Sequence, residues 1–154
     1  MIYSHKQEDP LLETLKPVVQ GLGMSIVELS VSKQRSGVQV RLTVTKKGVV
    51  GIDDCARVHH AIAPRLELAF PDQELSIEVS SPGVDRNIKD ASEFQLYIGR
   101  GVRCYRTDIS DWTAGILEYA DDHHVIIRGA KGTVELSYDS IAKAKLDYSQ
   151  EVED

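Results

Sequence analysis

Near residue 90 the chain changes from long alternating segments to short apolar segments separated by turn residues, and this change constrains the fold most. Short strands are expected at residues 102–105, 112–119, 125–127, 134–136 and 141–146. Five short strands in so little chain are typical of a small barrel of the SH3 or Sm type. We therefore expect an N-terminal α/β domain over residues 1–88 and a C-terminal Sm-like or SH3-like barrel with an acidic tail over residues 89–154. The junction is expected near residues 86–92.

The first domain begins with a helix and a hairpin. Asp9 can cap the helix and Pro10 suits its first turn, and apolar residues then recur at helical spacing as far as Leu22. Apolar and polar residues alternate from Ile26 to Val31, where Val27, Leu29 and Val31 form one series, and again from Val38 to Val44. Turn residues 34–37 separate the two segments, so they predict a hairpin with one buried face.

A second helix and a third strand complete this domain. Asp53 is an N-cap candidate, and an apolar stripe at helical spacing follows it as far as residue 69. Leu75, Ile77 and Val79 then alternate with polar residues, which predicts a strand. The order α-β-β-α-β predicts an α+β fold with two helices against one sheet.

Charge is distributed unevenly along the chain. The formal net charge is −6; residues 1–90 carry 11 Lys and Arg against 12 Asp and Glu, and residues 91–154 carry 7 against 12. An acidic balance argues against strong non-specific binding of nucleic acid, because phosphate contacts dominate that affinity. It suits a protein that meets a basic partner. No apolar run is long enough to span a membrane and no secretory signal is recognised, so we expect a cytoplasmic protein without a membrane partner.

Residues that could carry catalysis or metal binding give weak signals. Cys55 and Cys104 are expected to be small buried apolar residues. The pairs His59-His60 and His123-His124 each project in divergent directions, on a helix and on a strand respectively, so neither pair readily shares one ion. No nucleophile elbow, phosphate loop or dinucleotide fingerprint is present. We therefore expect no enzyme activity, no metal and no cofactor.

The segment Glu78-Val79-Ser80-Ser81-Pro82-Gly83-Val84-Asp85-Arg86 resembles the signature of the RimP family of bacterial ribosome maturation factors. Further similarity lies at residues 52–55, 94–100, 112–117 and 141–146, in the order and spacing of the family. The resemblance implies an N-terminal domain of KH type II-like arrangement and a C-terminal Sm-like barrel. It also implies a role in maturation of the small (30S) ribosomal subunit. The expected partners are the immature small subunit, its twelfth ribosomal protein and small-subunit rRNA.

A stand-alone RNA-binding module of the KH or Sm type is the alternative, because such folds also bind RNA on their own. The candidate ribosome-binding residues comprise the motif and the basic residues at the two ends of the hairpin: Ser80, Ser81, Pro82, Gly83, Asp85, Arg86, Lys33, Arg35, Lys46 and Lys47. Arg86 is the strongest of these, because a guanidinium binds phosphate in a bidentate fork. The motif could instead be a structural corner, and the hairpin cations could be solvated charges.

Acidic residues at the barrel turns are candidates for docking a basic ribosomal protein: Asp108, Asp111, Asp121 and Asp122. Turn chemistry alone also explains them. Tyr105, Trp112 and Tyr119 are expected in the barrel core, with docking of a peptide or an RNA base as the alternative. Arg103, Arg106 and Arg128 are candidates for its polar face. The nearly neutral N-terminal half would then be left to contact rRNA.

Overall fold

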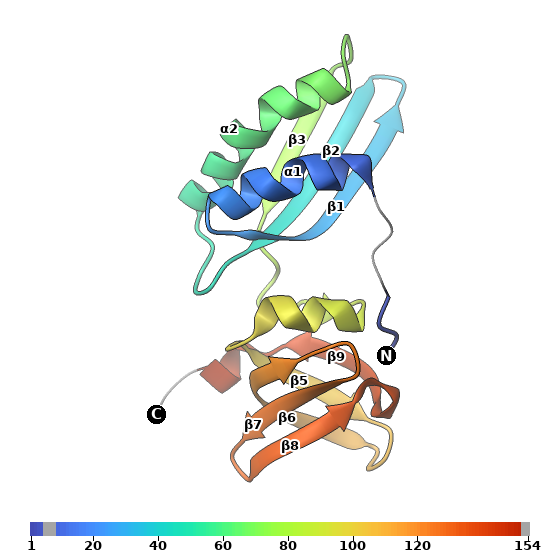
Figure 1. Ribbon diagram of the computed structural model, residues 1–154, viewed down its shortest axis with the longest axis vertical. Helices are drawn as coiled ribbons and strands as arrows, with labels where there is room; N and C mark the ends of the chain where they lie inside the picture. Colours follow the sequence, from blue (N-terminus) through green and yellow to red (C-terminus); the bar gives the residue numbers. More distant parts are fainter. Residues whose placement is uncertain (5–8, 152–154) are drawn as a thin grey trace. The chain divides into compact units, whose positions relative to one another are not determined.

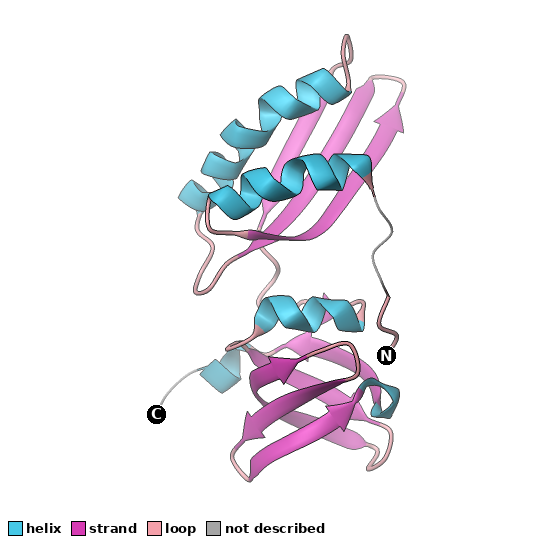
Figure 2. Cartoon of the chain, in the orientation of Figure 1, coloured by secondary structure: helices cyan, strands magenta, loops and turns pink. Residues whose placement is uncertain are grey.

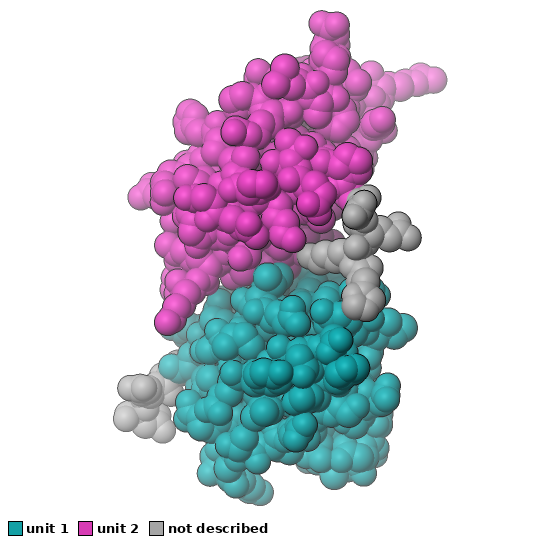
Figure 3. Space-filling view, in the orientation of Figure 1, with its two compact units in different colours: residues 1–6, 83–154 teal, residues 7–82 magenta. Residues whose placement is uncertain are grey.

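The computed structural model describes residues 1–4 and 9–151, which form two compact units of the α+β class. The N-terminal unit contains residues 9–82, and the C-terminal unit contains residues 1–4 and 83–151 (Figure 3). Within these residues no helix combines the length and the apolar character needed to cross a membrane.

The N-terminal unit has the predicted order of elements. They are α1 (Pro10–Gly21), β1 (Ser25–Gln34), β2 (Gly37–Thr45), α2 (Ile52–Ala69) and β3 (Leu75–Ser80). The strands form one sheet in the order β1-β2-β3, with β1 antiparallel and β3 parallel to β2. The parallel pairing follows because α2 carries the chain back across the sheet before β3 begins.

Both helices cover the same face of this sheet (Figure 1). The central strand supplies Val38, Val40, Leu42 and Val44, none more than 1% exposed. Against them pack the buried apolar residues of the two helices, Leu15, Val19, Val58, Ile62 and Leu66. Burying each such side chain contributes about 1.5–3 kcal/mol, so this layer supplies most of the unit's apolar stabilisation. The predicted alternation of the second strand is confirmed.

The start of the second helix differs from the prediction. Asp9 caps α1 as expected, since its carboxylate accepts a hydrogen bond from the Leu11 amide at 3.0 Å. In α2 the N-cap is Gly51, and the Asp54 carboxylate accepts from the Gly51 amide at 2.9 Å. Asp53 as N-cap was therefore wrong, because the helix begins before it.

A β-bulge alters the first strand. The register with β2 shifts between Ile26 and Glu28, so Val27 is an extra residue in the ladder. Ile26 consequently joins the core cluster, and Leu29 packs against it from the next inward position. Val31 continues this series but is 38% exposed, since it lies near the open end of an outer strand.

The C-terminal unit is built around a six-stranded antiparallel sheet that curls around its own core (Figure 2). The strands are β4 (Asn87–Ile88), β5 (Gly101–Arg106), β6 (Asp111–Ala120), β7 (His124–Gly129), β8 (Gly132–Ser137) and β9 (Ile141–Leu146). Their order is β4-β9-β5-β6-β7-β8. The five predicted strands are confirmed. Sequence reasoning missed β4 and three 3-10 helices, η1 (Ala91–Tyr97), η2 (Tyr138–Ser140) and η3 (Tyr148–Glu151).

Residues 1–4 join the C-terminal unit, whereas the sequence grouped them with residues 5–88. The Met1 ammonium donates to the Tyr138 carbonyl at 2.6 Å, and the Ile2 carbonyl accepts from the Ala91 amide at 2.9 Å. The Tyr3 ring stacks on Tyr138 with centroids 6.1 Å apart. These partners lie about ninety or more residues away in sequence, so no local pattern indicates them.

The C-terminal unit begins at Gly83, a few residues before the expected junction. Residues 86–92 are part of its structure: Asn87 and Ile88 pair with β9, and the Leu146 amide donates to the Arg86 carbonyl at 2.9 Å. The unit boundary therefore falls inside the Ser80–Arg86 motif.

Candidate functional site

The Ser-Ser-Pro-Gly motif runs from the end of β3 across the unit boundary. Ser80 is the last residue of β3, and Pro82 and Gly83 stand on either side of the boundary. The Gly83 carbonyl accepts from the Arg86 amide at 3.1 Å, which closes a turn. Ser81, Gly83 and Asp85 are exposed. The motif therefore has a structural role at this turn, and its exposed residues remain accessible to a partner.

Arg86 and Glu93 form a buried ion pair within the C-terminal unit. The Arg86 Nη2 atom lies 2.7 Å from Glu93 Oε1, and the two side chains are only 12% and 8% exposed. A guanidinium held in this way is occupied by a carboxylate and shielded from solvent. The geometry therefore favours the structural alternative for Arg86 over a contact with phosphate.

Tyr97 lies beside this ion pair and is fully buried. Burial, reinforced by the Glu93 carboxylate and opposed by Arg86, raises the pKa of Tyr97 to about 12. The phenol thus stays neutral and cannot serve as a base near neutral pH.

The four basic residues of the hairpin do not form one site. Lys33 and Arg35 are exposed at the turn between β1 and β2, whereas Lys46 and Lys47 follow the far end of β2. A strand of this length separates the pairs by roughly 25–30 Å. Lys46 is further engaged by Asp54, at 2.9 Å. The two pairs therefore cannot contact the same phosphate, and each could reach only a phosphate of its own.

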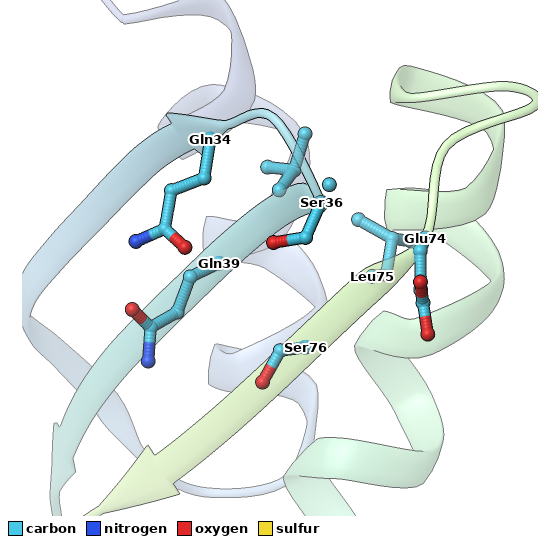
Figure 4. A pocket seen from close by; sticks show the side chains of 8 residues that line it. Gln34, Ser36, Gln39, Glu74, Leu75 and Ser76 are labelled. Atoms are coloured by element: carbon cyan, nitrogen blue, oxygen red, sulfur yellow. The ribbon is translucent and has the colours of Figure 1, made fainter.

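A pocket of about 310 Å³ lies at the turn end of this sheet, where the hairpin meets the start of β3 (Figure 4). Its lining offers amide and hydroxyl groups from Gln34, Gln39 and Ser76. Gly37 has φ +144°, and a Cβ there would lie 2.1 Å from the Glu74 carbonyl oxygen. The described lining contains no basic side chain, so the pocket has no means of holding an anion by charge.

The four acidic candidates lie at opposite ends of β6. Asp108 and Asp111 are at the β5–β6 turn, and Asp121 and Asp122 are at the β6–β7 turn. The Arg106 guanidinium binds Asp108 at 2.6 Å and lowers the pKa of that carboxyl. The structure therefore does not bring the four carboxylates together.

Asp121 organises the turn in which it lies. Its Oδ1 atom accepts from the amides of His123 and His124, each at 2.8 Å, and its Oδ2 atom accepts from the Tyr119 hydroxyl at 3.0 Å. These hydrogen bonds, the two amides first, lower the pKa of Asp121 to about 2. Asp122 is exposed beside it, and the carboxylates of Glu135 and Asp139 are exposed on the neighbouring β8 and η2 segments. We call Asp121, Asp122, Glu135 and Asp139 the acidic end.

The aromatic candidates are on the surface of the C-terminal unit and not in its core. Tyr105 and Trp112 pair across β5 and β6 with ring centroids 5.5 Å apart, and both are half-buried. Tyr119 is 45% exposed. The core instead contains Phe94 and Tyr97 from η1, which sequence reasoning assigned no packing role. Core packing as the default for Tyr105, Trp112 and Tyr119 was therefore wrong.

Cations surround the Tyr105–Trp112 pair. Lys143 Nζ lies 5.5 Å from the Trp112 ring centroid, with Lys145 Nζ at 5.8 Å and the Arg103 guanidinium carbon at 5.7 Å. Sequence reasoning named Arg103 and Arg106 but missed the two lysines. Their alternation along β9 could have revealed them, since residues two apart on a strand share a face. Arg128, also named, pairs with Glu118 elsewhere on the surface.

The described cysteines and histidines do not gather into a metal site. Both thiols are free, and burial raises the pKa of Cys104 to about 12. His59 and His60 are exposed on α2, and His124 lies between Asp121 and Glu135. Within residues 1–4 and 9–151, no three His, Cys, Asp or Glu side chains gather as metal ligands.

A comparison with protein families gives a match over the N-terminal part of the chain. Residues 14–85 match the family model described as the RimP N-terminal domain. The matched segment extends from the first turns of α1 to the Ser-Ser-Pro-Gly motif, so it covers nearly all of the N-terminal unit.

Proposed function

Because the chain belongs to the RimP family, we propose that it assists maturation of the small (30S) ribosomal subunit by binding, and not as an enzyme. The observation that carries this proposal is the match over residues 14–85. The surfaces of the chain support a binding role, because they carry ion pairs and contacts between aromatic rings and cations. In this role the chain would act in the cytoplasm, where it would meet immature small subunits.

The two units fit the fold types of this proposal. A KH type II-like arrangement of the N-terminal unit is supported by the α-β-β-α-β order, with β3 parallel to β2. An Sm-like or SH3-like barrel is supported by the curled antiparallel sheet of the C-terminal unit. Both fold types bind RNA in other proteins, which is a supporting analogy only.

The acidic end is the surface we propose for the twelfth small-subunit ribosomal protein. Ribosomal proteins are typically basic, and residues 91–154 carry most of the chain's net negative charge, with 12 Asp and Glu against 7 Lys and Arg. Asp122, Glu135 and Asp139 are exposed there, whereas the Asp108 carboxylate at the other end of β6 is bound by Arg106. Complementary charge would steer the basic partner towards the acidic end.

Calorimetry of the full chain with that ribosomal protein tests this surface. Reversing two exposed charges in the variant Asp122→Lys/Asp139→Lys should weaken binding roughly tenfold at low salt, because favourable rim contacts become repulsive. The matched control Glu13→Lys/Glu67→Lys makes the same change of net charge on the exposed sides of α1 and α2 and should bind normally. Equal losses in the two variants, or binding that strengthens as salt rises, would contradict the assignment.

A further inference from the structure

One outer face of the C-terminal unit combines cations with aromatic rings. The ladder pairings place Tyr105 beside Trp112 on one side and beside Lys143 on the other. Lys145 pairs with Arg103 on the same strands, two residues further along. Residues two apart on a strand point to the same side, so these side chains share one face of β6, β5 and β9. We call Arg103, Tyr105, Trp112, Lys143 and Lys145 the aromatic–cation face.

The lysines carry the uncompensated charge of this face. Asp147 binds Arg103 at 3.0 Å and therefore offsets its charge. Among the described residues, Lys143 and Lys145 have no carboxylate within ion-pair distance; their Nζ atoms lie over the Trp112 ring instead. An acidic half of the chain thus presents two accessible ammonium groups side by side, which is suited to an anionic partner.

A cavity adjoins Trp112 on this surface. It measures about 480 Å³, and Trp112, Ile109, Ala114 and Val134 supply apolar surface to its lining. Arg106, Lys131 and Asp111 are also in the lining, and Asp108 binds Arg106. The volume of the cavity is within the range of small-molecule sites. The cavity therefore adds an apolar recess to the cationic surface, with an aromatic ring shared between them.

We propose that the aromatic–cation face binds single-stranded RNA, with phosphates on Lys143 and Lys145 and a base in the adjoining recess against Trp112. Single-stranded nucleic acids are recognised by this combination of a basic track and aromatic platforms. An acidic peptide would use the lysines but would leave the ring and the recess without a partner. Identifying the RNA as small-subunit rRNA rests on the proposed function. The rRNA contact then moves from the N-terminal half, where the sequence indicated it, to the C-terminal unit.

Trp112 is the only tryptophan of the chain, so its fluorescence reports on this face directly. Titration of the full chain with a ten-nucleotide single-stranded RNA should quench that fluorescence saturably, and rising salt should weaken the binding. The variant Lys143→Glu/Lys145→Glu should bind at least tenfold more weakly. Loss of two phosphate contacts should also reduce the salt slope by about 1.4. The control Lys16→Glu/Arg65→Glu has the same net charge, alters only exposed side chains of α1 and α2, and should bind as the wild type does.

Three results would overturn the inference: loss of RNA binding in the control with retention in the Lys143→Glu/Lys145→Glu variant, quenching by polyglutamate but not by RNA, or no binding of either. Sedimentation of the unaltered chain with immature small subunits distinguishes a failure of the RNA-binding surface from a failure of the proposed function. Co-sedimentation without oligonucleotide binding refutes only the RNA surface. Quenching by RNA without co-sedimentation supports the RNA surface and refutes the ribosomal role. Far-ultraviolet circular dichroism and thermal unfolding should verify that both double variants are folded.

Discussion

Replacing Arg86 with alanine should lower the free energy of unfolding by about 3–5 kcal/mol, because it leaves the Glu93 carboxylate buried without its partner. Glu93 lies on η1, and Arg86 immediately precedes β4. Their ion pair thus ties the start of the C-terminal unit to the helix that supplies Phe94 and Tyr97 to the core. Urea unfolding followed by circular dichroism measures the loss directly.

A double substitution separates a structural role of Arg86 from a binding role. The variant Arg86→Met/Glu93→Leu replaces the ion pair with apolar side chains of similar volume and should recover most of the lost stability. If Arg86 acts only through this pair, the double variant should also bind immature small subunits normally. If the Arg86→Ala variant loses less than about 1 kcal/mol of its free energy of unfolding, the pair contributes no more than an exposed ion pair, and its burial is contradicted.

Replacing Phe94 with alanine should also lower the free energy of unfolding by about 3–5 kcal/mol, because the ring is fully buried. Phe94 stacks on Tyr138 with centroids 5.9 Å apart, and Tyr138 in turn stacks on Tyr3. Truncation would open a cavity beneath this stack and loosen the attachment of residues 1–4. Urea unfolding of the full chain again gives the magnitude.

Phe94→Leu is the matched control for this substitution. It retains much of the buried volume and should cost clearly less than the alanine variant, since the cost grows with the cavity that remains. Equal losses in the two variants would mean that the aromatic stack, and not the filled volume, determines the stability. A loss below about 1 kcal/mol in Phe94→Ala would contradict the packing of η1 against the sheet.

Local patterns in the sequence predict the elements well where one face is buried. Val38, Val40, Leu42 and Val44 alternate without interruption, and the structure confirms both the strand and its inward face. The bulge at Val27 was not predictable, because a period of two cannot reveal one extra residue in the ladder. The 3-10 helix at Ala91–Tyr97 is too short for a helical period to identify.

The candidate site depends more strongly on long-range pairings. Tyr105 and Trp112 are separated by a turn, but Lys143 and Lys145 reach them only because β9 pairs with β5. Arg86 was expected to be available for phosphate, because nothing in its local sequence indicates a buried ion pair with Glu93. The motif itself was recognised from sequence alone, and the match over residues 14–85 bears out the family.

Sedimentation of the full chain with immature small subunits tests the proposed ribosomal role most directly. Subunits from cells with stalled assembly and mature subunits are each mixed with the chain and separated on sucrose gradients at two salt concentrations. We expect the chain to migrate with immature subunits, to bind mature ones more weakly, and to turn over no substrate. The contrary result is a chain that stays at the top of both gradients while binding free RNA tightly, with a steep loss of affinity as salt rises. That outcome would indicate a stand-alone RNA-binding module in place of an assembly factor.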